Sequence, residues 1–321
     1  MPRFLYWPFQ IAAGPDGSLV WADREELRKA LDDLLLGVKP SRPSTLINIW
    51  AYYGAGKTYA LRYLERGARD AGIWSVYSVT PQGAVSFLDV YRSIASALSD
   101  EQLAAVESEL ELSSSDVGQS LYRSLRVKSI GSASQAALAT MYLTGRKTSA
   151  AQRRDLNAIV DLNYAAHAAE ALVITLKALG RTRGVVLLLD EVQNLSLMKP
   201  RALGETSGLL QQVFDGVQHG LRIVASFTTG MRETIRDVLG EALYHRASRL
   251  IEIPEFSEDE AVRFLRELIR PARSDARVGV FEPFSEARMR EMILAIREGG
   301  EKLVPREIIK GADNMYEPLG D

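Results

Sequence analysis

The sequence contains no cysteine. This absence excludes disulfides, thiolate metal sites and cysteine nucleophiles, and it fits a reducing compartment. Histidine is scarce too: His167, His219 and His245 are far apart and lack the spacing of metal ligands. Long apolar runs are missing, since VVLLL at 185–189 is far below membrane-spanning length. The net charge of −2 supplies no global basic field, so any nucleic-acid binding would depend on a local patch.

The N-terminus shows no targeting signal. In MPRFLYWPFQ a charged stretch is not followed by an apolar one, and Pro2 and Pro8 interrupt the segment. We therefore expect a soluble, cytoplasmic protein with no membrane partner. The 321 residues, 46% of them apolar, are enough for one large α/β domain and a smaller one.

Strands and helices alternate along the chain. Periodicity and turn residues predict strands at 45–50, 72–79, 184–191, 221–227 and 249–253, and helices at 24–36, 57–70, 86–98, 257–271, 285–298 and 305–314. A further helical stretch is predicted at 151–179, ending at Gly180. The fold class that follows is α/β, a doubly wound parallel five-stranded sheet with a long helical insertion and a small all-α C-terminal subdomain.

Three segments are expected along the chain. Residues 1–44 form an N-terminal segment with one linker helix, and residues 45–254 form the α/β core. The core contains the helical insertion at about 100–183. Pro254 marks the boundary to the helical subdomain, residues 255–321.

The stretch AYYGAGKTYA, residues 51–60, is nearly the phosphate-binding P-loop pattern G-x-x-x-x-G-K-[ST]. Its position between a predicted strand and a predicted helix is the context that a P-loop requires. Backbone N–H groups and a helix N-terminus would bind phosphates, Lys57 would reach the β- and γ-phosphates, and Thr58 would ligate Mg²⁺. We therefore expect ATP and Mg²⁺ as cofactors. The predicted nucleotide-binding residues of the loop are Ala51, Tyr52, Tyr53, Gly54, Ala55, Gly56, Lys57, Thr58 and Tyr59.

Ala51 replaces the first glycine of the pattern. That glycine mainly eases the turn out of the strand, and alanine costs about 1 kcal/mol there only if the backbone needs a positive φ. The residues that contact phosphate and metal are all present. We therefore predict nucleotide binding with a φ below zero at Ala51.

A pair of carboxylates ends the apolar stretch LLLDE. Asp190 lies at the carboxyl end of a predicted core strand, where ligands bind in open α/β sheets. It is suited to hold Mg²⁺ through the water shell of the ion, and Glu191 is suited to polarise a water for attack on the γ-phosphate. The alternative is that both residues merely end a strand in solvent. The presence of both motifs in this order favours the catalytic interpretation.

The order of these motifs resembles that of AAA+ P-loop ATPases of the initiator and transposon-regulator type. The family's loop often reads GxxGxGKT, and the corresponding positions here are Ala51, Gly54, Gly56, Lys57 and Thr58. DEVQNL at 190–195 is similar to the Walker B region of the TnsC and TniB type of ATPase. Asp23-Arg24-Glu25 is similar to the family's N-linker element.

The resemblance implies roles for further residues. Thr228, with Thr229 as second choice, matches sensor 1, which orients the attacking water. Arg246 and Arg249 match the arginine fingers that reach the nucleotide of a neighbouring subunit, which implies a homo-oligomeric ring or filament. The alternative is a pair of surface arginines before an edge strand. Arg306 matches sensor 2, which contacts the γ-phosphate from the C-terminal lid.

Within the insertion, an acidic run at 100–111 is followed by a basic excess at 112–183. The acidic residues at 112–183 are Asp116, Asp155, Asp161 and Glu170, and the basic residues are Arg123, Arg126, Lys128, Arg146, Lys147, Arg153, Arg154, Lys177, Arg181 and Arg183. The segment that leads into Walker B is similar to ATP-binding proteins of BREX-type phage-defence systems. The excess makes the insertion the candidate DNA-facing part, and the alternative is a solvated helical face.

Two functions are compatible with these patterns. The first is an ATP hydrolase that uses ATP at subunit interfaces as an assembly or conformational switch, associated with DNA in transposition regulation or phage defence. The second is a signalling or scaffold NTPase that recruits a protein effector without binding DNA. Basic residues that share one face would favour the first. Basic residues that are ion-paired with the acidic 100–111 run would favour the second.

Overall fold

The computed structural model describes residues 4–9, 24–229, 231–275 and 279–317. They form two compact units. The loop–lid unit consists of the described residues within Met1–Asp33, Ala51–Tyr63 and Glu252–Asp321, and the sheet unit consists of those within Leu34–Trp50 and Leu64–Ile251. The segment boundaries expected from the sequence stay a prediction. Within the described ranges, no helix combines the length and the apolar character that crossing a membrane would require.

Most predicted elements are present with small shifts at their ends. The strands are β1 (Thr45–Ala51), β2 (Trp74–Val79), β3 (Val185–Asp190), β4 (Leu221–Thr228) and β5 (Ala247–Glu252). The α-helices are α1 (Glu25–Leu36), α2 (Lys57–Asp70), α3 (Phe87–Ser96), α4 (Asp100–Leu110), α5 (Asp116–Ile130), α6 (Ala133–Leu143), α7 (Ala150–Asp155), α8 (Ala165–Thr182), α9 (Pro200–Gly216), α10 (Arg232–Arg246), α11 (Glu258–Ile269), α12 (Glu286–Glu298) and α13 (Pro305–Tyr316). Two 3₁₀-helices, η1 (Val192–Leu197) and η2 (Arg270–Ala272), complete them.

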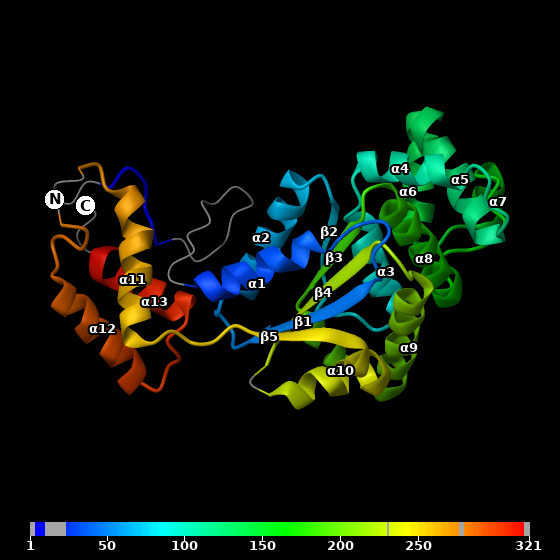
Figure 1. Ribbon diagram of the computed structural model, residues 1–321. Helices are drawn as coiled ribbons and strands as arrows, with labels where there is room; N and C mark the ends of the chain where they lie inside the picture. The colour runs from blue at the N-terminus through cyan, green and yellow to red at the C-terminus, as the bar shows by residue number, and fades with distance from the viewer. Residues whose placement is uncertain (1–3, 10–23, 230, 276–278, 318–321) are drawn as a thin grey trace. The chain divides into compact units, whose positions relative to one another are not determined.

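The five strands form one all-parallel sheet in the order β2-β3-β4-β1-β5, as predicted from the sequence. The burial of each strand follows from its position. β3 is buried at every residue, because both of its faces and both of its edges are covered. β2 lies at the sheet edge and alternates between buried and partly exposed residues. Helix α3 packs on β2 and α8 packs on β3 and β4 (Figure 1). Since the strands are parallel, β1, β3 and β4 end at the same edge of the sheet.

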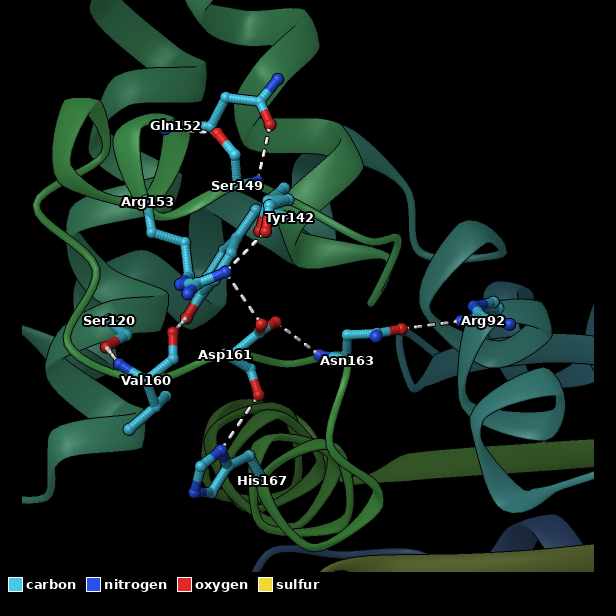
Figure 2. A network of polar contacts seen from close by, with 11 residues as sticks. Arg92, Ser120, Tyr142, Ser149, Gln152, Arg153, Val160, Asp161, Asn163 and His167 are labelled. Carbon is cyan, nitrogen blue, oxygen red and sulfur yellow. Dashed lines mark hydrogen bonds and ion pairs between the residues drawn. The ribbon is translucent and has the colours of Figure 1, made fainter.

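The predicted helical stretch at 151–179 is wrong in its continuity. Residues 150–155 form α7 and residues 165–182 form α8, so α8 also continues past Gly180. The intervening segment is non-helical because side chains compete for its backbone (Figure 2). The N–H groups of Ile159 and Val160 donate to Ser120 Oγ at 2.8 and 3.3 Å, and the Val160 carbonyl accepts from the Tyr142 hydroxyl at 2.9 Å.

Asp161 is the centre of this network (Figure 2). One carboxylate oxygen accepts from the Asn163 N–H at 2.9 Å, and the other pairs with Arg153 at 2.8 Å. The Asp161 carbonyl lies 3.0 Å from Nδ1 of His167, on the first turn of α8. Arg92 of α3 reaches Asn163 at 3.1 Å. These contacts connect the inserted helices to the layer that covers the sheet.

The lid helices have a core of their own within the loop–lid unit. α11 starts at a capping box, in which Ser257 accepts from the Glu260 N–H and the Glu260 carboxylate accepts from the Ser257 N–H. α11, α12 and α13 pack against one another. Phe9 from the N-terminal segment joins this core. The centre of its ring lies 5.1 Å from the ring centre of Tyr316, which is almost fully buried.

Candidate functional site

The loop between β1 and α2 depends on two glycines. Gly54 has a φ of 79° and Gly56 a φ of 102°, values that L side chains rarely adopt. A Cβ at Gly54 would lie 2.7 Å from Cβ of Arg306, so a side chain is also excluded sterically. Ala51 is the last residue of β1. Since positive φ among the described non-glycine residues occurs only at Asn157 and Glu191, the prediction for Ala51 is confirmed.

Lys57 begins α2 and is buried although it carries a charge, with 5% of its surface exposed. Its Nζ donates to the carbonyls of Ala51 at 3.3 Å and Tyr52 at 2.9 Å. The ammonium group is thereby held within the loop, beside the N–H groups of the helix start. Thr58 lies in the first turn of α2 and is exposed. Tyr59 follows it, and partial burial raises the pKa of its phenol.

Two tyrosines of the loop contact cations from the C-terminal segment. Nζ of Lys302 lies 4.6 Å from the centre of the Tyr52 ring, and the Arg306 guanidinium lies 4.4 Å from the centre of the Tyr53 ring. The N–H of Arg306 donates to the carbonyl of Gly54 at 3.4 Å. Nε of Arg306 is buried and has no hydrogen-bond partner among the described residues. The predicted sensor 2 residue therefore lies against the loop with a donor available for an anion.

Arg24 connects the same loop to the segment after β5. Its guanidinium donates to the carbonyls of Ala55 at 3.2 Å and Pro254 at 2.9 Å, and it stacks 4.1 Å above the ring of Phe256. Burial lowers the pKa of Arg24 to about 10, and the nearby Glu260 carboxylate opposes this shift. Arg24 thus remains charged at neutral pH and braces the loop. Asp23, the preceding residue of the N-linker element, lies outside the described residues.

Asp190 ends β3 and is held by both neighbouring strands. It is 1% exposed. Its Oδ2 accepts from the Tyr77 hydroxyl of β2 at 2.7 Å, and its Oδ1 accepts from the Ser226 hydroxyl of β4. These contacts fix the carboxylate at the edge where the strands end. Neither Tyr77 nor Ser226 was predicted from the sequence, although Ser226 and Thr228 have the two-residue spacing that puts strand residues on one face.

Glu191 follows in a left-handed backbone conformation, with φ 56° and ψ 37°. This conformation costs a residue with a Cβ about 1–2 kcal/mol, and such strain is found at functional sites. The Glu191 N–H donates to Asp190 Oδ1 at 3.0 Å, and the Glu191 carboxylate accepts from the Gln193 side-chain amide. The carbonyl of that amide accepts from the Thr228 N–H at 2.9 Å. The strained turn separates the two carboxylates of the motif.

The two sensor 1 candidates differ in their hydroxyl groups. The Thr229 hydroxyl is engaged in a local turn, donating to the Met231 carbonyl and accepting from the Met231 N–H, both at 3.0 Å. The Thr228 hydroxyl is buried and has no hydrogen-bond partner in the described part of the chain. An unpartnered buried hydroxyl is costly unless a ligand or a water satisfies it. The geometry therefore favours Thr228.

The two candidate arginine fingers differ in whether their guanidinium group already has an ion-pair partner. Arg246 ends α10 and forms a 2.8 Å ion pair with Asp215 of α9, and it also donates to the Ala242 carbonyl at 3.1 Å. Arg249 lies on β5 and is exposed. Over the described ranges, Arg249 forms no ion pair. Arg246 is thus ion-paired within the chain, whereas Arg249 is exposed.

The basic residues of the insertion are partly neutralised by the acidic run. Lys128 pairs with Asp100 at 2.5 Å, Arg183 pairs with Glu101 at 3.4 Å, and Arg126 lies 3.8 Å from Glu107. Exposed pairs of this kind add little stability. They nevertheless lower the local positive potential. The DNA-binding hypothesis requires that potential to be high.

No family model and no curated protein matches this sequence. Solved structures are similar to it. A Walker-type ATPase of Pyrococcus abyssi is 15% identical with a TM-score of 0.57, over 98% of this chain and 73% of that one. An ORC2 protein of Aeropyrum pernix, in ADPNP and ADP complexes, is 14% identical with a TM-score of 0.55, over 98% and 67%. Cdc6p from Pyrobaculum aerophilum is 13% identical with a TM-score of 0.50, over 96% and 63%.

These similarities concern the fold, because the sequence identities are low. The parallel five-stranded sheet with flanking helices is an α/β fold, and the similarity to these structures extends over nearly the whole chain. The fold class expected from the sequence is therefore confirmed. The chain spans between 63% and 73% of the length of these three proteins.

Proposed function

We propose that this chain is an ATP hydrolase that binds ATP at the 51–58 loop and uses its hydrolysis as a conformational and assembly switch. The observation that carries the proposal is the loop itself. Two glycines with positive φ, at Gly54 and Gly56, lead directly into α2, and the buried ammonium of Lys57 is held within the loop. A buried lysine beside a helix start is a preformed site for phosphate.

Each residue has a role that its surroundings support. Lys57 and the N–H groups of the α2 start bind phosphate oxygens, and Arg306 Nε offers a further donor from the lid. Glu191 takes the proton of the attacking water, and the Thr228 hydroxyl orients that water. The remaining loop residues, from Tyr52 to Tyr59, shape the backbone that surrounds the phosphates.

We propose Mg²⁺ as the metal that is bound together with the nucleotide. No cluster of three or more carboxylate, histidine or cysteine ligands exists among the described residues. Mg²⁺ does not need one, because it is usually bound by one or two carboxylates, phosphates and water. The sequence patterns assign metal binding to Asp190 and to Thr58, and we propose these two residues as ligands. Mg²⁺ would neutralise charge on the phosphates.

Two kinds of partner are compatible with the charges of the insertion, DNA and a protein effector. From the sequence resemblance we propose a cytoplasmic homo-oligomer that acts in transposition regulation or phage defence and transmits its state to a partner protein. The basic excess of the insertion supports DNA as a ligand. The pairing of Lys128, Arg183 and Arg126 with the acidic run instead supports the second function, an ATP-dependent scaffold that recruits a protein effector.

One experiment tests the proposed function and separates its two forms. Phosphate release by the purified chain is measured with Mg²⁺ and with EDTA, and then with duplex DNA over a range of salt. We expect hydrolysis with Mg²⁺ and none with EDTA. If DNA is the ligand, stimulation by DNA falls steeply with salt, because each phosphate contact contributes a slope of about −0.9 to log K against log salt. Equal rates with and without DNA at every salt concentration would favour the protein effector.

Arg249→Ala is expected to lose most of its hydrolysis and keep its affinity for ATP. A finger supplied by a neighbouring subunit is worth roughly 10³ to 10⁵ in rate. Arg246→Ala should have the smaller effect, because Arg246 already neutralises Asp215. Arg201→Ala, a change at a highly exposed arginine paired with Glu205, is the control. Mixing Arg249→Ala with Lys57→Ala protomers should restore part of the hydrolysis, and no restoration would exclude a finger acting between subunits.

A further inference from the structure

The side chain of Gln193 links the two residues assigned to the attacking water. Its Nε2 donates to the Glu191 carboxylate, and its Oε1 accepts from the Thr228 N–H at 2.9 Å. Gln193 lies on η1 and Thr228 ends β4, so the link joins the segment after β3 to the neighbouring strand. All three residues belong to the sheet unit.

Gln193 donates a hydrogen bond to the carboxylate of Glu191. In the described parts of the chain, no other residue forms a hydrogen bond or ion pair with the Glu191 carboxylate. The backbone of Glu191 is left-handed, so its side chain does not have the orientation that an extended residue of β3 would give it. The orientation of the carboxylate therefore depends on the amide of Gln193.

The same amide also binds Thr228, the other residue that is assigned to the attacking water. The Thr228 N–H donates to Gln193, and the buried Thr228 hydroxyl has no partner in the described ranges. Glutamine is suited to this bridge because one amide offers both a donor and an acceptor. Glutamate lacks the donor that the Glu191 carboxylate needs. Asparagine is one methylene too short to span the same distance.

We propose that Gln193 is the positioning residue for hydrolysis, which holds the Glu191 carboxylate and the Thr228 hydroxyl in register on one water. The inference rests on the proposed function. Gln193 would act through its contacts with Glu191 and Thr228. Its effect is on kcat, because it orients groups that act in the transition state, and not on the affinity for ATP.

The test compares Gln193→Ala and Gln193→Glu with Gln119→Glu. Gln119→Glu makes the same charge change as Gln193→Glu at a partly exposed glutamine of α5, where its oxygen can still accept from Arg123. We expect both Gln193 variants to lower kcat by roughly 10- to 100-fold, since small misplacements of catalytic groups cost this much. The KM and the affinity for a fluorescent ATP analogue should stay within about twofold of wild type, and Gln119→Glu should leave all three unchanged.

A second measurement separates positioning from a general structural role. In the Glu191→Gln background, single-turnover hydrolysis should fall by no more than about twofold when Gln193→Ala is added, because residues that act as a unit are not additive.

A further loss in that background, an unchanged kcat in the single variants, or a weakened affinity for ATP would overturn the inference. A rise in kcat would also overturn it, since Gln193 would then hold the base out of position. If wild type hydrolyses no ATP, the proposed function itself fails, whereas wild-type hydrolysis with unchanged Gln193 variants removes this inference alone.

Discussion

Lys57→Ala is expected to lose most of its nucleotide binding, with a Kd for ATP roughly 10- to 100-fold higher than that of wild type. The variant loses a charge-assisted contact worth about 1.5–3 kcal/mol, and every 1.4 kcal/mol changes Kd tenfold. The ammonium is buried and bound to two carbonyls of the loop, so the substitution also loosens the loop backbone. Titration with a fluorescent ATP analogue measures the affinity.

Lys199→Ala is the matched control for this variant. Lys199 is also located at the start of a helix, the N-cap of α9, but it is exposed and not preceded by a glycine loop. Its removal should leave the affinity unchanged. Thermal unfolding of both variants shows whether the fold is kept. Wild-type affinity in a folded Lys57→Ala protein would exclude the 51–58 loop as the phosphate site.

Glu191→Gln is expected to bind ATP with wild-type affinity and to hydrolyse it about 10² to 10⁴ times more slowly, the usual contribution of a general base. The amide cannot take a proton from water. It keeps the length and the Cβ of glutamate, so the left-handed backbone is not relieved of strain. Single-turnover phosphate release measures the rate. The variant should also accumulate in its assembled state with ATP, which size-exclusion chromatography detects.

The control for this variant is Glu205→Gln. Glu205 is an exposed carboxylate of α9 that pairs with Arg201 at 3.0 Å, and the change should leave hydrolysis intact. Normal hydrolysis by Glu191→Gln would mean that another group activates the water. The buried Asp190, bound by Tyr77 and Ser226, would then be the next residue to test.

Local patterns were sufficient for the strands and for the loop. β3 is a continuous apolar run because it is buried on all sides, and such a run is visible in the sequence. Gly54 and Gly56 mark positions where the backbone must adopt positive φ, which is again a property of the residues themselves. The break between α7 and α8 was missed because Ser120 and Tyr142, which bind its backbone, come from other helices.

The pairs of equivalent candidates show the same limit. Arg246 and Arg249 are equally good fingers in the sequence, and only the position of α9 gives Arg246 a partner in Asp215. Thr228 and Thr229 are likewise indistinguishable until Met231 is seen to occupy the Thr229 hydroxyl. The charge of the insertion is also a matter of partners, because ion pairs form between residues that are far apart in the chain.

The sequence by itself determined the five strands, the glycine loop at 51–58 and the acidic end of β3, because these depend on residue type and local spacing. Only the tertiary structure decided which polar groups are occupied and which remain available. Tyr77 reaches Asp190 because β2 and β3 pair in one register, with Tyr77 opposite Leu188 and Val79 opposite Asp190. Gln193 reaches Thr228 because β3 and β4 are neighbours in the sheet. Strand neighbours and register depend on the packing of the whole sheet and not on any one segment.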